Sequence, residues 1–83
     1  MPNVIITPEA ARELDALPVV IRIRVQAVIV RLANWPNVSG AKPLRGKLAG
    51  NWRIRTGDYR VIFEVAADTV IVWKIGNRGG IYD

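Results

Sequence analysis

The segment from residue 51 to residue 63, NWRIRTGDYRVIF, constrains the fold more than any other part of the chain. Successive side chains of a β-strand point to opposite faces of a sheet, so this alternation separates the arginines from the large apolar side chains. Gly57 and Asp58 can form the two-residue turn of a hairpin, but the usual order is Asp-Gly, which leaves the turn type open. The segment therefore predicts a β-hairpin with one apolar face and one cationic face.

The cationic face of this hairpin lowers the stability of the sheet. With a turn at Gly57 and Asp58, Arg55 faces Arg60, and Arg53 lies on the same face. Like charges directly opposite one another destabilise a sheet by roughly 0.2–1 kcal/mol. A polyanion bound to this face would turn the cost into a gain, whereas the alternative is an ordinary solvated face of a half-covered sheet. The hairpin alone does not decide between them.

The composition excludes several kinds of catalytic and metal-binding site. The 83 residues are enough for one domain, spanning residues 1–83, and 51% of them are hydrophobic. The chain contains no cysteine and no histidine, which removes thiolate sites, the commonest metal ligand and the commonest general base. We therefore expect no metal and no cofactor, and any catalysis at neutral pH must use Arg, Lys, Tyr, Asp or Glu.

The charge is uneven along the chain. The formal net charge is +5, and residues 42–83 hold eight Lys and Arg against four acids. Such an excess favours a nucleic acid or an acidic protein as partner. A membrane is disfavoured, since the longest apolar run, residues 19–33, is interrupted by three arginines and is too short to span. The N-terminus has no signal-peptide pattern, so we expect a cytoplasmic protein.

The order of the predicted elements indicates an α+β fold. Residues 3–6 form a strand candidate, and Thr7-Pro8-Glu9 is typical of a helix start, with a helix predicted to residue 17. Residues 19–33 are ambiguous between strand and helix, but their length and apolar spacing favour a helix. Residues 37–43 are predicted to be a loop. We expect a strand, a two-helix hairpin and then a three-stranded antiparallel meander ending at residue 75, with both helices packed on one face of the sheet.

Several side chains outside the hairpin bear on function. The three tryptophans, Trp35, Trp52 and Trp73, are predicted to be core or boundary aromatics rather than base-stacking platforms. A cationic cluster that would attract phosphates without reading sequence is predicted from Lys42, Arg45 and Lys47. Together with Lys74, these are the candidate RNA-binding residues.

Motifs over almost the whole chain resemble the RelE/ParE superfamily of type II toxins. They are LRG at residues 44–46, WRIR at 52–55, GDYRVIF at 57–63, VIVWKIGNR at 70–78 and Tyr82. The resemblance to the RelE-type branch implies a metal-independent endoribonuclease that cleaves mRNA in the ribosomal A site by 2′-hydroxyl attack and so inhibits translation. It also implies a cognate antitoxin as partner in a hetero-oligomer, with the ribosome and mRNA as targets.

The same resemblance implies roles for five residues, Arg53, Arg55, Arg60, Arg78 and Tyr82. Arg60 matches a transition-state arginine, Arg78 an arginine near the leaving group, and Tyr82 a catalytic tyrosine. The branch commonly has lysines where this chain has Arg53 and Arg55, and arginine does not readily exchange a proton. Tyr82, whose pKa the surrounding arginines are expected to lower, is then the best remaining base. The alternative within the superfamily is a ParE-like toxin that binds and inhibits DNA gyrase without nuclease activity.

Overall fold

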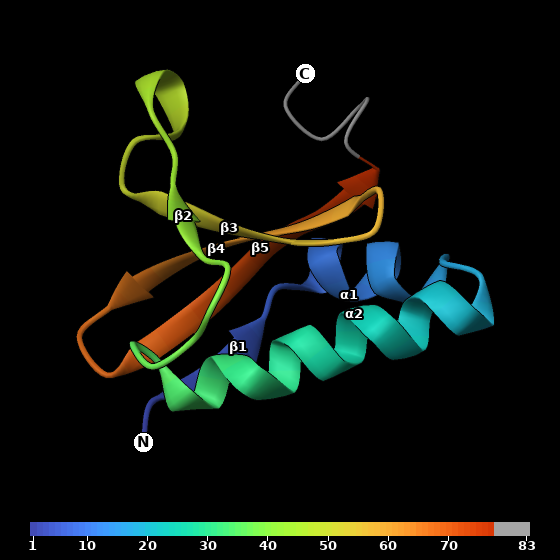
Figure 1. Cartoon of the computed structure of the whole chain (residues 1–83), viewed down its shortest axis with the longest axis horizontal. Helices are drawn as coiled ribbons and strands as arrows, with labels where there is room; N and C mark the ends of the chain where they lie inside the picture. Colours follow the sequence, from blue (N-terminus) through green and yellow to red (C-terminus); the bar gives the residue numbers. More distant parts are fainter. Residues whose placement is uncertain (78–83) are drawn as a thin grey trace.

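A computed structural model of the chain describes residues 1–77. Its elements, with η marking short 3₁₀ helices, are β1 (Asn3–Ile6), α1 (Pro8–Asp15), α2 (Val19–Arg31), η1 (Leu32–Asn34), β2 (Lys42–Pro43), η2 (Gly46–Leu48), β3 (Asn51–Thr56), β4 (Tyr59–Ala66) and β5 (Thr69–Asn77). The strands form a five-stranded sheet in the order β1-β5-β4-β3-β2, in which β1 runs parallel to β5 and the other neighbours are antiparallel (Figure 1). The predicted α+β class and antiparallel meander are confirmed.

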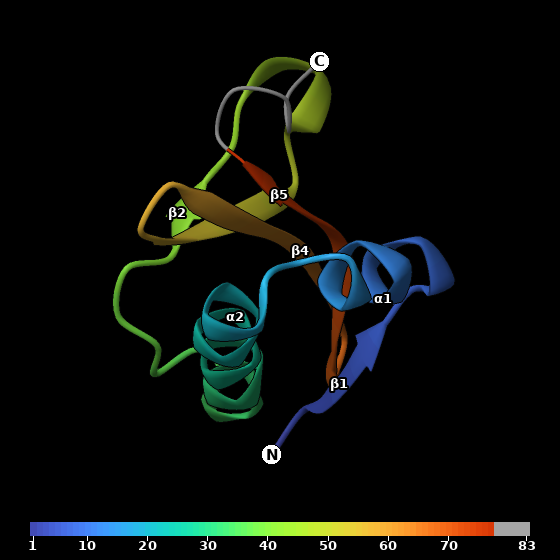
Figure 2. The same ribbon diagram turned by 90° about the vertical axis from the view of Figure 1, so that its right-hand side faces the viewer.

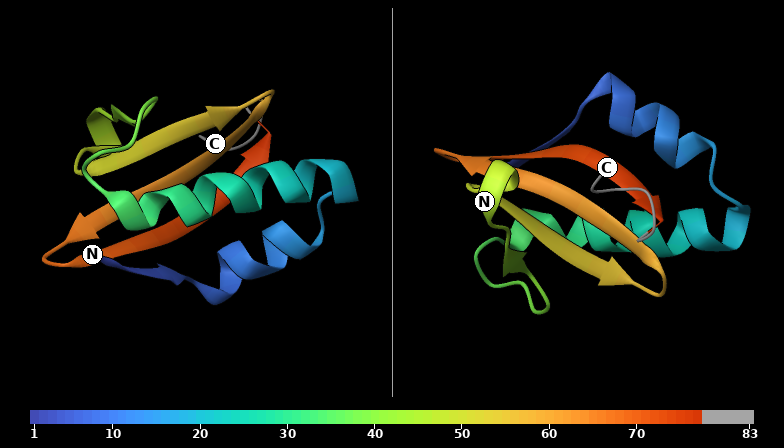
Figure 3. Two further views of the ribbon diagram at one scale, coloured as in Figure 1. Left: turned by 60° about the horizontal axis from the view of Figure 1, so that its bottom comes forward. Right: turned by 90° about the horizontal axis from the view of Figure 1, so that it is seen from above.

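The two α helices cover the same face of the sheet, as predicted (Figures 2 and 3). The Thr7 hydroxyl accepts a hydrogen bond of 3.2 Å from the Ala10 N–H, and Pro8 occupies the first turn of α1. Both features are the expected helix-start signals. α1 ends at Asp15, two residues before the predicted end, and α2 begins directly after Pro18. None of the helices in residues 1–77 is long and apolar enough to cross a membrane.

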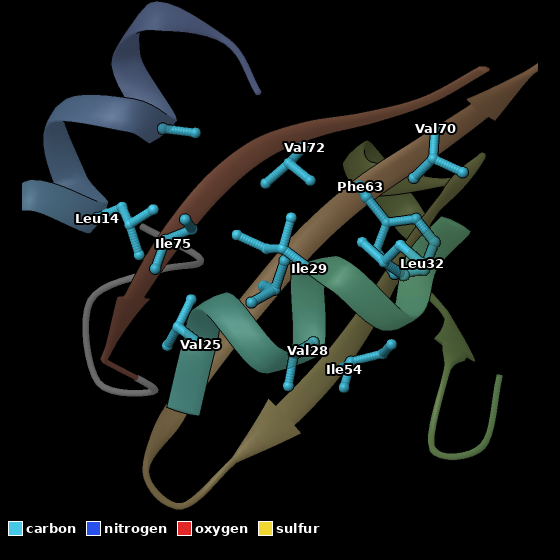
Figure 4. Close-up of a cluster of buried hydrophobic side chains, with 12 residues drawn as sticks. Leu14, Val25, Val28, Ile29, Leu32, Ile54, Phe63, Val70, Val72 and Ile75 are labelled. Atoms are coloured by element: carbon cyan, nitrogen blue, oxygen red, sulfur yellow. The ribbon is translucent and has the colours of Figure 1, made fainter. Parts of the chain in front are cut away.

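A single hydrophobic cluster joins these helices to the sheet (Figure 4). From β4 comes Phe63, which is 0% exposed, and β5 contributes Val70, Val72 and Ile75. α1 contributes Ala10 and Leu14, α2 contributes Val25, Val28 and Ile29, and η1 contributes Leu32. Trp35 packs edge-on against Trp52 at a ring-centroid distance of 4.9 Å. We call the sheet face that meets this cluster the inner face and the opposite one the outer face.

The β3–β4 hairpin has the register expected from its sequence. Arg55 pairs with Arg60, and Arg53 pairs with Ile62. Gly57 takes a φ of +61° at the first central position of the turn, which matches the type II′ turn and resolves the turn type. The apolar residues that alternate with the arginines along the two strands, including Ile54, Val61 and Phe63, lie in the core. The hairpin therefore has the predicted apolar and cationic faces.

Three further boundaries differ from the sequence prediction. Residues 42–43, expected to lie in a loop, form the edge strand β2, in which Lys42 pairs with Arg53 and Pro43 with Trp52. α2 gives way to the 3₁₀ helix η1 after Arg31, and β5 continues two residues beyond the predicted end, to Asn77. The edge position of β2 suits Pro43, because a proline cannot donate to a sheet ladder.

A β-bulge interrupts the pairing of β4 with β5. Ile62 pairs with Lys74, but its neighbour Phe63 pairs with Val72, which leaves Trp73 as the extra residue. A bulge of this kind shifts the phase of the strand that contains it. Val72 and Ile75 consequently both reach the inner face, although they are three residues apart. The bulge also places Trp73 and Lys74 together on the outer face.

Candidate functional site

The predicted cations of the sheet meet on the outer face. Two rows of paired positions cross the strands there, the first running through Lys42, Arg53, Ile62 and Lys74, and the second through Arg55, Arg60 and Gly76. Neighbouring strands lie about 4.8 Å apart, so cations on adjacent strands of these rows are close neighbours. The structure thus brings together five of the predicted site residues, Lys42, Arg53, Arg55, Arg60 and Lys74.

An open pocket lies at the β2–β3 edge of this face. Its volume is about 540 Å³, and it is lined by Gly40, Lys42, Arg53, Arg55 and Gly57. The two glycines add no side chains that would fill it. Within residues 1–77, no carboxylate pairs with Lys42, Arg53 or Arg55. A pocket with several cations and no internal counter-charge is suited to an anion.

Arg60 occupies a more enclosed position than the arginine it faces. Its side chain is half-buried and its Nε and Nη1 atoms are shielded from solvent, whereas Arg55 is exposed. Guanidinium groups present several donors in a rigid plane that fits the oxygens of a phosphate. The pair therefore offers one solvent-facing and one partly shielded guanidinium beside the same pocket.

Two further predicted cations extend the surface beyond the sheet. Arg45 and Lys47 are exposed, and η2, in which Lys47 lies, stands on the opposite side of the sheet from α2 (Figures 1 and 2). η2 is tied to the start of β3 by a hydrogen bond of 3.3 Å from the Asn51 side chain to the Leu48 carbonyl. These cations therefore flank the end of the outer face that lies farthest from the β3–β4 turn.

Trp73 is the outer-face residue that the sequence prediction assigned wrongly. Trp35 and Trp52 pack against the core as expected, but Trp73 is 46% exposed. Its indole Nε1–H donates a hydrogen bond of 3.0 Å to Glu64 Oε1. The sequence contained one signal of the bulge, which is Lys74. Strict alternation in β5 would have pointed that lysine into the core, and a bulge at Trp73 avoids this.

The remaining predicted site residues, Arg78 and Tyr82, lie outside the described residues. Within residues 1–77, no group of carboxylates is arranged to hold a metal ion, and the sequence has no histidine or cysteine to add to one. The cationic groups that the outer face offers are guanidinium and ammonium donors. Their arrangement can bind a phosphate and stabilise added negative charge on its oxygens.

Known proteins resemble this chain in both sequence and fold. A family model described as "ParE toxin of type II toxin-antitoxin system, parDE" matches residues 4–82. The toxin RelE3 of Methanocaldococcus jannaschii is 33% identical over 75 residues, which cover 87% of this chain and 85% of that toxin. The toxin RelG of Mycobacterium tuberculosis is 32% identical over 82 residues, covering 92% and 90%.

A solved complex supports the same assignment. The crystal structure of the RelBE2 toxin–antitoxin complex of M. tuberculosis matches with a TM-score of 0.81 and 32% identity, covering 94% of this chain and 100% of the matched one. The family model and the two toxins each span most of the chain, so fold and sequence point the same way. The chain therefore belongs to the RelE/ParE superfamily and is a toxin of a type II toxin–antitoxin system.

Proposed function

We propose that this toxin is a ribosome-dependent endoribonuclease that cleaves mRNA in the A site and so stops translation. The observation that carries the proposal is the cluster of Lys42, Arg53 and Arg55 around an open pocket, with no carboxylate partner in the described residues. Arg60 lies beside it, directly opposite Arg55. The similarity to toxins named RelE3 and RelG supports the RelE-type activity.

The chemistry needs no metal. The ribose 2′-hydroxyl loses its proton to a base and attacks the adjacent phosphorus, the bond to the 5′ oxygen breaks, and that oxygen takes up a proton from solvent. The products are a 2′,3′-cyclic phosphate and a 5′-hydroxyl end. Arg53, Arg55 and Arg60 would stabilise the charge that gathers on the phosphorane oxygens, and preorganised cations are a large catalytic term. Tyr82 is the proposed base, and Arg78 would act near the leaving oxygen.

The shape of the site explains why such an enzyme would need the ribosome. The pocket is open, so it can hold a phosphate but encloses little of the ribose and base around it. Attack by the 2′-oxygen requires an in-line geometry, and orientation of this kind supplies a large part of the rate in many enzymes. A message held in the A site would arrive already oriented. In the cell, a cognate antitoxin is expected to bind the toxin and block this face.

The test maps mRNA 5′ ends in a purified translation system, with the toxin present or absent and with ribosomes included or omitted. The variants are Arg60→Ala and Tyr82→Phe, and Arg24→Ala, on the exposed side of α2, is the matched control. We expect ribosome-dependent cuts inside A-site codons that the two site variants abolish and the control keeps. An intact message at toxin concentrations that stop cell growth would refute the proposal.

The second candidate is inhibition of DNA gyrase, which the match to the ParE family model favours. This function would require a protein-binding surface but no reacting tyrosine. Tyr82→Phe should therefore leave growth inhibition largely intact, and wild-type toxin should block supercoiling by purified gyrase. The nuclease proposal expects the opposite in both measurements.

A further inference from the structure

The bulge in β5 places an aromatic side chain and a cation side by side on the outer face. Trp73 and Lys74 are consecutive, yet both lie on the outer face, because Lys74 pairs with Ile62 and Trp73 is the unpaired residue of the bulge. Bulges often re-aim a side chain at a functional surface. Counted from the inward Val72, the residue re-aimed here is Lys74, and it is placed next to Trp73, the largest side chain type in proteins.

The indole is exposed but held in place. Trp73 is 46% exposed, whereas the other two tryptophans pack against the core. The 3.0 Å hydrogen bond from Nε1–H to Glu64 Oε1 fixes the edge of the ring. An aromatic side chain that stays exposed to water does not contribute the free energy that its burial in the core would provide. An oriented, accessible ring on a cationic surface is the arrangement that single-stranded nucleic-acid binders use for stacking bases.

We propose that Trp73 is a stacking platform for one base of the single-stranded RNA that crosses the outer face. This inference rests on the proposed nuclease function and deepens it by assigning a nucleobase subsite. Glu64, which holds the ring, lies four residues along β4 from Arg60, which corresponds to about 13 Å at the rise of a strand. A single-stranded RNA covers that distance within a few nucleotides of the phosphate held by the arginines.

The charges around Trp73 fit the same occupant. Lys74 lies beside the ring in the same row of paired positions as Arg53, where it can contact a phosphate of the linking backbone. Arg45 and Lys47, next to the start of β3, flank the Trp73 end of the face. Stacking accepts any base, because every base has an aromatic face. The platform would therefore position the message without selecting a sequence.

The experiment is a coupling measurement between Trp73 and individual bases of the message. Ribosomes are programmed with a message whose A-site riboses are 2′-O-methylated, so that it binds without being cleaved. The affinities of wild type and Trp73→Ala are measured on this message and on copies with one abasic nucleotide at each position in turn. Val30→Ala on α2, a side chain 72% exposed, is the matched control for loss of an exposed apolar group.

We expect Trp73→Ala to weaken binding by about 5- to 150-fold, the range of a single base stack. At one nucleotide position the abasic message should bind wild type as weakly as it binds the variant, because both changes remove the same contact. Glu64→Gln keeps an acceptor for the indole and removes a negative charge near the RNA, so its affinity should match or exceed that of wild type. Val30→Ala should bind like wild type.

Three results would overturn the inference. If wild type cleaves mRNA but Trp73→Ala binds as tightly as wild type, the nuclease stands and the stacking role falls. If the losses of affinity from Trp73→Ala and from the abasic nucleotide add at every position, the ring does not contact a base and its effect comes from the structure of the protein. If Trp73→Ala weakens binding of the cognate antitoxin and leaves RNA binding unchanged, the ring is a protein contact. Failure of wild type to cleave on the ribosome would instead refute the proposed function itself.

Discussion

Arg55 lies directly opposite Arg60 across the β3–β4 ladder, so two guanidinium groups share one face of a hairpin. Such a pair costs roughly 0.2–1 kcal/mol. Arg55→Thr removes the repulsion and introduces a residue that favours strands. We expect its free energy of unfolding in urea to rise by up to about 1 kcal/mol while cleavage of mRNA falls.

Salt gives the control for this prediction. Repulsion between exposed charges is screened as ionic strength rises, so the stability gained by Arg55→Thr should shrink in about 1 M NaCl, where the Debye length is about 3 Å. A variant that is less stable than wild type at low salt would mean that Arg55 has a structural role. In that case the like-charge pair would no longer be evidence for an anionic ligand.

Lys42 provides a separate measure of phosphate binding. It pairs with Arg53 and lines the same pocket. Loss of one phosphate contact reduces the slope of log affinity against log salt by about 1. We expect Lys42→Ala to weaken RNA binding at low salt and to flatten this slope, measured by titration at several salt concentrations. Arg12→Ala, at an exposed position of α1, is the control. An unchanged slope for Lys42→Ala would place the lysine outside the RNA site.

Glu13 connects α1 to the bulged strand. Its Oε1 atom accepts a hydrogen bond of 3.0 Å from the backbone N–H of Ile75, two residues beyond Trp73. Removing the carboxylate leaves a partly buried donor without its partner, at a cost of about 1–3 kcal/mol. We expect Glu13→Ala to lower the free energy of unfolding by that amount and Glu13→Gln by less. The control is Asp15→Ala at the exposed end of α1, and equal losses from both alanine variants would contradict this role.

The meander and its cationic face were predictable because β3 and β4 alternate strictly around a turn that contains glycine. The second helix was ambiguous for a physical reason. Its solvent side also carries apolar residues, since Val19, Val20, Ile23 and Val30 are 58–72% exposed. Periodicity alone then separates strand from helix poorly. Length decided in favour of the helix, and the structure confirms that choice.

Two features escaped the sequence prediction because they depend on neighbours in space. The edge strand β2 has only two residues, one of them Pro43, so no alternation marks it, and it exists because β3 offers a free edge. The sequence predicts Trp73 as a core or boundary aromatic, but its side chain is 46% exposed. Trp73 points outward because it follows the inward Val72, and the bulge brings Lys74 to the same face, so the out-of-phase Lys74 was the only trace of the bulge in the sequence.

The bulge itself can be separated from the side chain it displays. Deletion of Trp73 or of Lys74 leaves one residue between Val72 and Ile75, so either deletion restores strict alternation with both of these residues inward. We expect both variants to fold with melting temperatures within about 8 °C of wild type, equivalent to roughly 1 kcal/mol for a domain of this size.

Only the variant lacking Lys74 keeps the indole on the outer face. It should retain the coupling to one base of the message, whereas the variant lacking Trp73 should lose it, although both carry the same regular ladder. Binding to the programmed, 2′-O-methylated message measures the difference. If both deletions weaken RNA binding equally, the geometry of the bulge matters to the site and the ring does not. If neither deletion weakens RNA binding, the outer face binds its ligand through the cations alone.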